Sequence, residues 1–365
     1  MEMASIVDYV NQNGQYSFSE RPFNDVDGTI LAQLAYVDFS LLNKKHIHKL
    51  AQLTPELIQK STVHTWNPAG NQALLKAAQL SQRFGQLKWD NYAQKIDPKL
   101  EQQFSAITFT IAPDTYYIAY RGTTATLVDW KEDFNMTFMD AVPSQRAATH
   151  YFQKQSLKQP GYYYLGGHSK GGNLAFYAAA HSQTQAIKGV YSIDGPGLKK
   201  PLPEELQTRA HKLIPDASII GLLLEPETNY TVVKSDGQGI RQHDPYTWLV
   251  KNNHFEVIAS VSRFSQFTQA SISTWLAGMD DATKQEFLDS VFALVSADGE
   301  KHFSELGKEW PQTLQMIAAG IAATDDQTRR HWLDITGQLG DVVTHQARKL
   351  LKKEFDHYKN IFPDK

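Results

Sequence analysis

Short apolar runs recur along the middle of the chain, and each is rich in β-branched or aromatic residues. Runs of this kind predict buried strands, and apolar residues at helical spacing between them predict helices. The expected strands cover residues 104–111, 115–120, 162–165, 189–193, 213–215 and 230–234. The first two flank the turn Pro113-Asp114, which predicts an antiparallel hairpin that opens the sheet. Strand and helix then alternate to about residue 260, which predicts an α/β fold with a mostly parallel central sheet.

The regions on either side of this alternation follow a helical period. Residues 1–100 are expected to be mainly helical, with Asn24 or Asp25 capping one helix and Asn71 capping another. From Arg263 onward the apolar spacing is helical throughout. We therefore expect two domains, residues 1–262 and a carboxy-terminal helical extension over residues 263–365. Three roles for the extension stay open: covering a site on the first domain, binding a partner, or supporting its packing.

Composition narrows the class of protein. The 365 residues carry 36 basic and 39 acidic side chains, a net charge of −3, so no nucleic-acid partner is expected. The absence of cysteine excludes disulfides and a thiol nucleophile. The amino terminus lacks the cationic and apolar regions of a signal peptide, and no apolar run approaches ~18 residues. We therefore expect a cytoplasmic protein without a transmembrane segment. Its oligomeric state is left open by the sequence.

A Gly-x-Ser-x-Gly motif centred on Ser169 lies between an expected strand and an expected helix. A strand that runs directly into a helix requires a sharp turn, and the residue at its apex exposes its side chain from a strained backbone. Gly167 and Gly171 remove the Cβ atoms that would collide across such a turn. The motif therefore predicts that Ser169 is a nucleophile.

A nucleophilic serine requires a base and an acid, in the chain order Ser, acid, His for an α/β-hydrolase. Asp194 ends the strand after the nucleophile helix and is the first acid candidate; Asp216, one strand further on, is the alternative. His243 lies on a polar loop that follows the β-branched strand 230–234. In an α/β-hydrolase the catalytic histidine lies on a loop after the last strand of the sheet, so His243 is the first candidate for the base. His254 is the second candidate, but it falls inside an expected helix. The remaining histidines lack a ligand spacing with carboxylates, so no metal and no cofactor is expected.

An oxyanion hole usually combines the amide after the nucleophile, here that of Lys170, with an amide from an earlier strand–loop junction. An expected strand breaks at Arg121-Gly122-Thr123, which is followed by Asp129-Trp130 and Asp133. This pattern resembles the oxyanion segment of class 3 lipases, and Gly167 to Gly172 resembles their Gly-His-Ser-x-Gly-Gly elbow. The resemblance implies that Thr123 donates the second amide.

The chain is more closely similar to a bacterial branch of lipase-like α/β-hydrolases. That branch has Gly-His-Ser-Lys-Gly-Gly-Asn, Asp-Gly-Pro-Gly and Gln-His-Asp-Pro, which stand here at 167–173, 194–197 and 242–245. The amino-terminal segments 24–27 and 36–39 are also similar to it. The resemblance covers about residues 1–260 and implies an α/β-hydrolase fold with Ser169 as nucleophile and His243 as base.

The resemblance leaves the acid open, because fungal-type class 3 lipases take it from a position like Asp216 and pancreatic-type lipases from one like Asp194. Lys170 departs from the apolar residue usual in class 3 lipases. Its cation would suit an anionic or polar substrate, unless the side chain points to solvent.

Together these features predict a serine hydrolase that acts on a small-molecule ester or lipid through an acyl-enzyme. The alternatives are a non-catalytic hydrolase-fold scaffold that binds a protein partner, and an acyltransferase that uses the same triad.

Overall fold

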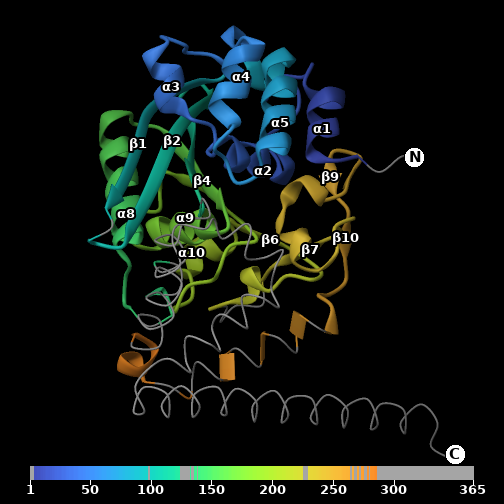
Figure 1. Cartoon of the computed structure of the whole chain (residues 1–365). Coiled ribbons are helices and arrows are strands. Elements are labelled where there is room, and N and C mark those ends of the chain that lie inside the picture. Colours follow the sequence, from blue (N-terminus) through green and yellow to red (C-terminus); the bar gives the residue numbers. More distant parts are fainter. Residues whose placement is uncertain are drawn as a thin grey trace, which may run out of the picture.

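A computed structural model describes residues 4–285, except 98, 124–131, 133–134, 138, 225–228, 264, 267–268, 271–272, 275–277 and 279. Its centre is an eight-stranded sheet in the order β1-β2-β3-β4-β5-β6-β7-β10 (Figure 1). The strands are β1 Lys88–Asp97, β2 Gln102–Ala112, β3 Thr115–Tyr120, β4 Tyr162–His168, β5 Ile187–Ile193, β6 Ala210–Pro215, β7 Thr231–Val233 and β10 Val257–Ile258. A separate two-stranded ribbon pairs β8, Val250–Lys251, with β9, His254–Phe255.

The strands from β3 to β7 run parallel, which confirms the expected α/β fold with a mostly parallel sheet. At one side β1, β2 and β3 pair antiparallel, and at the other β10 pairs antiparallel with β7. Since parallel strands end at the same edge, the carboxyl ends of β3, β4, β5 and β6 lie together, where open α/β sheets place their sites.

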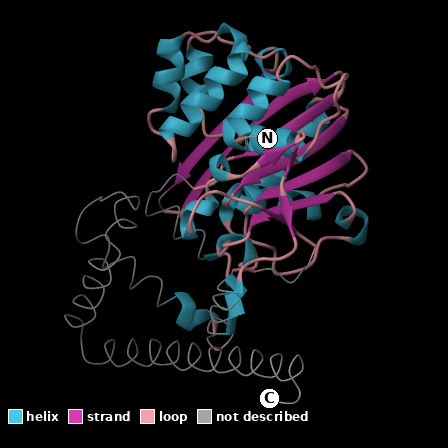
Figure 2. Cartoon of the chain, turned by 90° about the vertical axis from the view of Figure 1, so that its right-hand side faces the viewer, coloured by secondary structure: helices cyan, strands magenta, loops and turns pink. Residues whose placement is uncertain are grey.

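Helices cover both faces of the sheet (Figure 2). The amino-terminal helices pack on one face with α2 against β3, β4 and β5, and α8 and α9 pack on the other. The α-helices are α1 Ile6–Asn13, α2 Asp25–Leu34, α3 Phe39–Lys44, α4 Pro55–Thr62, α5 Pro68–Leu80, α6 Gln82–Gly85, α8 Pro143–Lys158, α9 Lys170–Ala180 and α10 Glu204–Gln207. The 3-10 helices are η1 Leu50–Gln52, η2 Ile220–Leu222, η3 Gly239–His243 and η4 Pro245–Thr247.

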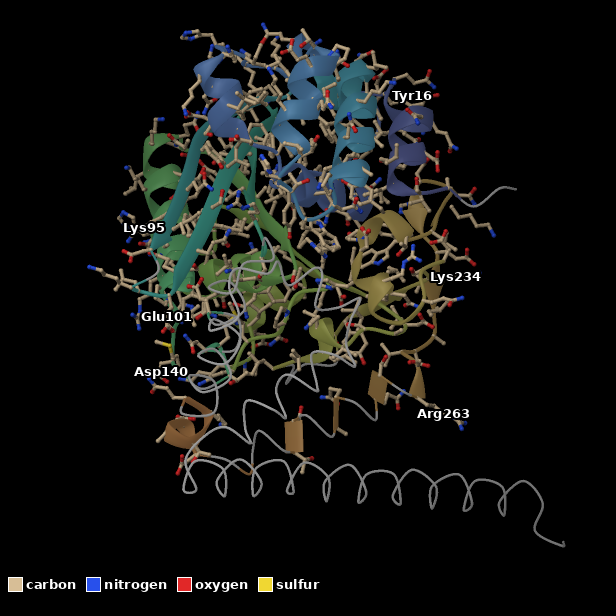
Figure 3. The ribbon with its side chains drawn as sticks, in the orientation of Figure 1. Tyr16, Lys95, Glu101, Asp140, Lys234 and Arg263 are labelled. Atoms are coloured by element: carbon tan, nitrogen blue, oxygen red, sulfur yellow. The ribbon has the colours of Figure 1, made fainter. Side chains whose placement is uncertain are left out.

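The alternation of side chains along β3 explains the two cores. Tyr117 and Ala119 pack with the amino-terminal helices, whereas Ile118 and Tyr120 pack with α8 and α9, because successive strand residues point to opposite faces. Charged side chains such as Lys95 and Arg263 lie on the outside (Figure 3). Because β3 is buried on both faces, its sequence does not alternate between polar and apolar residues and is instead a nearly continuous run of aromatic and apolar residues.

The amino-terminal part is helical up to α6, but its last segment is not. The expectation of helix up to residue 100 is wrong for β1, whose edge pairing with β2 places Trp89 in the core. The hairpin β2–β3 therefore does not open the sheet.

The side chain of Asn24 caps α2, as expected. Asn71 does not cap α5: the cap is Asn67, which accepts from the Gly70 amide and precedes Pro68 at the first helical position. Asn71 instead accepts a 2.8 Å hydrogen bond from the Tyr246 hydroxyl.

Residues 286–365, most of the expected carboxy-terminal extension, lie outside the described residues, so the division at residue 262 stays a prediction. Among the described helices, none combines the length and the apolar character needed to cross a bilayer.

Candidate active site

Ser169 lies at the apex of the turn between β4 and α9. Its backbone has φ 57° and ψ −129°, a region that non-glycine residues rarely adopt and that stores strain. A Cβ added at Gly167 or Gly171 would collide with the backbone of Gly171 or Tyr120, respectively, so both positions require glycine. The local structure is that of a nucleophile elbow, with the serine backbone amide donating to the Ile193 carbonyl at the end of β5 (2.9 Å).

Asp194 follows β5 directly and is almost fully buried, with 1 % of its surface exposed. One carboxylate oxygen, Oδ2, lies 2.7 Å from Nδ1 of His243. The other, Oδ1, accepts a 2.5 Å hydrogen bond from the Ser218 hydroxyl. Asp194 also has a positive φ of 45°, so this turn too is strained. Both oxygens of the carboxylate are therefore engaged and its orientation is fixed.

The second acid candidate, Asp216, is half-buried at the end of β6. Its carbonyl accepts hydrogen bonds from Ser262 and Ser265, but within the described part of the chain its carboxylate has no hydrogen bond to His243 or to any other group. The structure thus brings Asp194, and not Asp216, to the imidazole.

His243 ends the 3-10 helix η3, and Asp244 caps the following 3-10 helix η4 through the Tyr246 amide. Because Nδ1 faces Asp194, Nε2 is the ring nitrogen left for a proton exchange with substrate or nucleophile. His254 lies in β9 rather than in the expected helix, and its side chain is exposed. The ribbon forms because residues 252 and 253 take left-handed conformations that reverse the chain.

His168, the residue before Ser169, is buried next to His243, with ring centroids 4.6 Å apart. Its Nε2 lies 2.8 Å from the His243 carbonyl, which can only accept, so Nε2 carries the proton and Nδ1 accepts from the Tyr36 hydroxyl at 3.1 Å. Burial, with His243 next to it, holds the pKa of His168 well below its ordinary value. The ring also stacks on Trp66, with centroids 5.4 Å apart. A neutral His168 thus links the loop of His243 to the turn after α2 and to the strand–helix turn of Ser169.

The segment expected to supply the second oxyanion amide lies beside the serine. A Cβ added at Gly122 would lie 3.3 Å from the Ser169 Cβ and would collide with the His168 carbonyl and the Tyr36 hydroxyl. Thr123 follows this close approach directly, and residues 124–131 lie outside the described residues. The structure therefore places Thr123 and Lys170 on the two chain segments that flank Ser169.

The side chain of Lys170 points neither to solvent nor into an open substrate site, so both expectations for it are wrong. It is buried, and its ammonium pairs with Glu132 at 3.2 Å, with both side chains 0 % exposed. Glu132 also accepts from the backbone amides of Gln103 (3.0 Å) and Ser144 (2.8 Å) and from the Ser144 hydroxyl. The first turn of α9 is thereby linked to β2 and to the start of α8.

Among the described residues no group of three or more His, Asp or Glu side chains could hold a metal ion.

The sequence model of one protein family, described as Mbeg1-like, matches residues 78–293, more than half of the chain. The chain belongs to the Mbeg1-like family. The match begins before β1 and includes Ser169, Asp194 and His243. With the strand order and the elbow described above, the resemblance to lipase-like α/β-hydrolases is confirmed. No curated protein matches the chain.

Three of the solved structures that are similar to part of this chain are lipases, at low identity and low TM-score. Lip2 lipase from Yarrowia lipolytica has 10% identity and a TM-score of 0.30, covering 48% of this chain and 82% of its own. M37 lipase has 15% identity and a TM-score of 0.36, and the match covers 55% of this chain and 70% of the M37 lipase chain. Lipase II from Rhizopus niveus has 12% identity and a TM-score of 0.32, and the match covers 64% of this chain and 82% of the lipase II chain.

The sequence analysis missed four residues that contact the site: Tyr36, Ser218, Glu132 and His168 in its role between loops. Tyr36 stands in the segment 36–39 that the sequence analysis singled out, and Ser218 lies two residues after the acid candidate Asp216. No local pattern shows that their hydroxyls reach His168 and Asp194. Glu132 stands within the segment that resembles the oxyanion region, and its acidic side chain gives no sequence signal of the burial that the structure shows.

Proposed function

We propose that this Mbeg1-like protein is a serine hydrolase that cleaves a carboxylic ester through a covalent acyl-enzyme. The observation that carries the proposal is the 2.7 Å contact between His243 Nδ1 and Asp194 Oδ2, in a chain whose Ser169 has the backbone of a nucleophile elbow. A carboxylate that orients a histidine, combined with a serine at a strained strand–helix turn, is the set of groups that activates a hydroxyl for attack.

Each residue then has one role. Ser169 Oγ attacks the ester carbonyl carbon while His243 Nε2 takes the hydroxyl proton; Asp194 stabilises the resulting imidazolium. The amides of Thr123 and Lys170 hold the oxyanion. Collapse of the tetrahedral intermediate breaks the bond to the leaving alkoxide, which receives the proton from His243. Water, deprotonated by His243, then releases the acid and restores the serine.

The buried groups around the triad support this role rather than that of an inert scaffold. A scaffold needs neither a positive φ at Ser169 nor a buried carboxylate with both oxygens engaged, since each costs stability. Strain and buried charge of this kind concentrate where chemistry is done.

The test is hydrolysis of p-nitrophenyl acetate by the full chain and by Ser169→Ala and His243→Ala. We expect turnover from the unaltered protein and losses of about 10⁴- to 10⁶-fold in both variants. Turnover unchanged by either substitution would exclude the triad. Added methanol separates hydrolysis from acyl transfer, because an acyltransferase would give mostly methyl acetate.

A further inference from the structure

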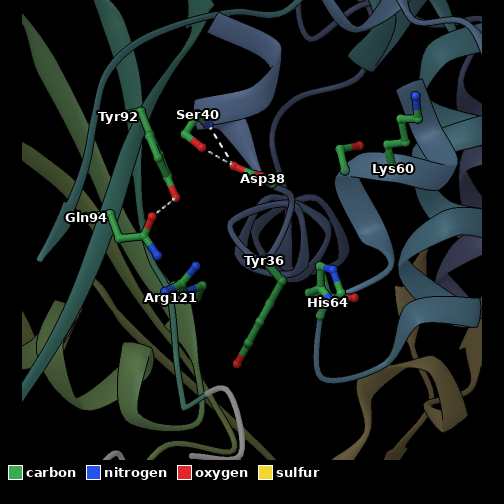
Figure 4. Close-up of a pocket in the computed structure, with 10 residues that line it drawn as sticks. Tyr36, Asp38, Ser40, Lys60, His64, Tyr92, Gln94 and Arg121 are labelled. Carbon is green, nitrogen blue, oxygen red and sulfur yellow. Dashed lines mark hydrogen bonds between the residues drawn. The ribbon is translucent and has the colours of Figure 1, made fainter. Parts of the chain in front are cut away.

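The loop between α4 and α5 lies beside the site, although it belongs to the amino-terminal helices. His64 of this loop lines a pocket together with Tyr36, whose hydroxyl contacts His168 (Figure 4). The Trp66 ring stacks on the His168 ring, and its centroid lies 6.1 Å from that of the His243 ring. A loop far from His243 in the sequence therefore packs next to its imidazole.

Asn67, the last residue of this loop, makes two hydrogen bonds with the two ends of its side-chain amide. Its Oδ1 accepts from the Gly70 amide at 2.8 Å and so caps α5, while its Nδ2 donates to Oδ2 of Asp244 at 2.7 Å. A backbone amide can only donate and a carboxylate can only accept, so these partners determine the orientation of the side chain. Asn67 thus joins the start of α5 to the residue directly after His243.

The Asp244 carboxylate is engaged at both oxygens. Oδ1 accepts from the Tyr246 amide at 3.0 Å, and Oδ2 accepts from Asn67. Burial raises the pKa of Asp244, and the hydrogen bonds from the Tyr246 amide and from Asn67 oppose this rise. The Tyr246 hydroxyl makes a second link to α5, because it donates to Asn71 at 2.8 Å. The residues that follow His243 are therefore attached to α5 at two points.

We propose that Asn67 and Asp244 are positioning residues, whose hydrogen bond sets where the His243 imidazole lies. The proposal rests on the proposed hydrolase function, in which His243 takes the proton of the nucleophile. Asp194 fixes the direction of the ring through Nδ1, but the ring can keep this contact while the loop that carries it shifts. Because a misplacement of about 1 Å can cost roughly 10²-fold in rate, a hydrogen bond away from the substrate can still control turnover.

Asn67→Ser tests the hydrogen bond without adding a charge. Serine is a favoured N-cap, so α5 keeps its cap, but the shorter side chain no longer reaches Asp244. We expect kcat for p-nitrophenyl acetate to fall by about tenfold or more and KM to change by less than about twofold, because the lost interaction acts on the chemical steps. Thr54→Ser exchanges the cap of the neighbouring helix α4 and is the matched control, with the kinetics of the unaltered protein.

An exchange of the two side chains provides the rescue. Asn67→Asp keeps the cap of α5 but brings two carboxylates together at the 2.7 Å contact, so kcat should fall at least as far as in Asn67→Ser. Adding Asp244→Asn restores one amide and one carboxylate, with the direction of the hydrogen bond reversed and an oxygen still available to the Tyr246 amide. The double variant should recover kcat to within about threefold of the unaltered protein. Losses that simply add in the double variant would contradict the proposal.

A readout that needs no turnover separates this inference from the proposed function. In NMR spectra of histidine-labelled protein, the ring signals of His243, assigned by their loss in His243→Ala, report the surroundings of the imidazole. We expect Asn67→Ser to shift them and the exchange of Asn67 and Asp244 to return them. Urea denaturation of each variant measures its stability separately from its activity.

The outcomes then divide cleanly. Shifted ring signals in a protein without esterase activity would support the positioning role and overturn the hydrolase. If the unaltered protein is active, kcat decides: an Asn67→Ser protein that is less stable but keeps its kcat would show a purely structural hydrogen bond, which overturns the inference and leaves the hydrolase standing. If the unaltered protein is inactive, unchanged His243 signals in Asn67→Ser overturn both.

Discussion

Ser218 Oγ donates a 2.5 Å hydrogen bond to Oδ1 of Asp194, the carboxylate oxygen that His243 does not contact. Ser218 is 2 % exposed and its hydroxyl oxygen in turn accepts from the Gly221 amide at 3.0 Å. The Asp194 carboxylate is therefore held from both sides, by His243 at one oxygen and by the loop after β6 at the other. The loop that carries Asp216, the alternative acid candidate, supplies the residue that orients Asp194.

Exchanging the two candidate acids for amides should have very different effects. Asp194→Asn should lower kcat by about 10⁴, because an amide cannot hold the imidazole in the tautomer that accepts the serine proton. Asp216→Asn should change it by no more than about twofold, as expected of a carboxylate away from the site. Steady-state kinetics with p-nitrophenyl acetate measures both. Larger losses in Asp216→Asn would move the acid to the later strand.

Removing the Ser218 hydroxyl should weaken the site without abolishing it. Ser218→Ala leaves the Asp194–His243 contact in place but frees one carboxylate oxygen, so kcat should fall by roughly tenfold, the value of one hydrogen bond to a charged group. The exposed Ser156→Ala on α8 is the control and should behave like the unaltered enzyme. Equal activities in the two variants would show that Ser218 does not position the acid.

His168 should make the stability of the fold depend on pH. Its pKa in the folded chain lies well below that of the unfolded chain, so the unfolded chain takes up the proton first as the pH falls. The contribution of neutral His168 is fully present above about pH 6.5 and is lost below it, by up to ~1.4 kcal/mol per pH unit.

Urea denaturation between pH 8 and pH 5 measures this slope. His168→Gln cannot be protonated and should flatten the acid limb even where it is less stable at pH 8. The exposed His150→Gln should keep the slope of the unaltered protein. An unchanged slope in His168→Gln would mean that His168 is not buried neutral.

The Lys170–Glu132 pair should show strong coupling. Lys170→Met leaves the Glu132 carboxylate buried without its cation, which should cost about 3–5 kcal/mol in the free energy of unfolding. Adding Glu132→Gln removes the uncompensated charge, so the double variant should be more stable than Lys170→Met alone. Denaturant titration of the two single variants and the double variant gives the coupling. Additive losses would show that the pair is not a unit.

The strands and the elbow could be predicted because their signals are local. A bulky run such as Tyr162-Tyr163-Tyr164-Leu165 predicts a strand from its aromatic residues alone, although Tyr162 is exposed and Tyr164 half-buried in the structure. Glycines on either side of Ser169 indicate a tight turn. The same reasoning failed for β1, whose mixed polar and apolar residues become a strand only through pairing with β2. Edge pairing is tertiary information, and no window of sequence contains it.

The candidate site divides in the same way. Ser169, Asp194 and His243 follow strand ends, so chain order was enough to single them out. The choice between Asp194 and Asp216 depended on which strand end reaches the histidine, a matter of three-dimensional distance. The buried position of the Lys170 side chain depends on its ion pair with Glu132, which lies 38 positions away in the sequence. Neither residue alone indicates that the pair is buried.

The central claim, a nucleophilic Ser169, is tested most directly by a fluorophosphonate probe. Attack by an activated serine displaces fluoride and leaves a phosphonyl group on the oxygen, which intact mass spectrometry detects and peptide mapping locates. We predict one adduct per chain, on Ser169, whose formation is suppressed in Ser169→Ala and slowed in His243→Ala. Labelling at another serine, or equal labelling of the Ser169→Ala protein, would contradict the account.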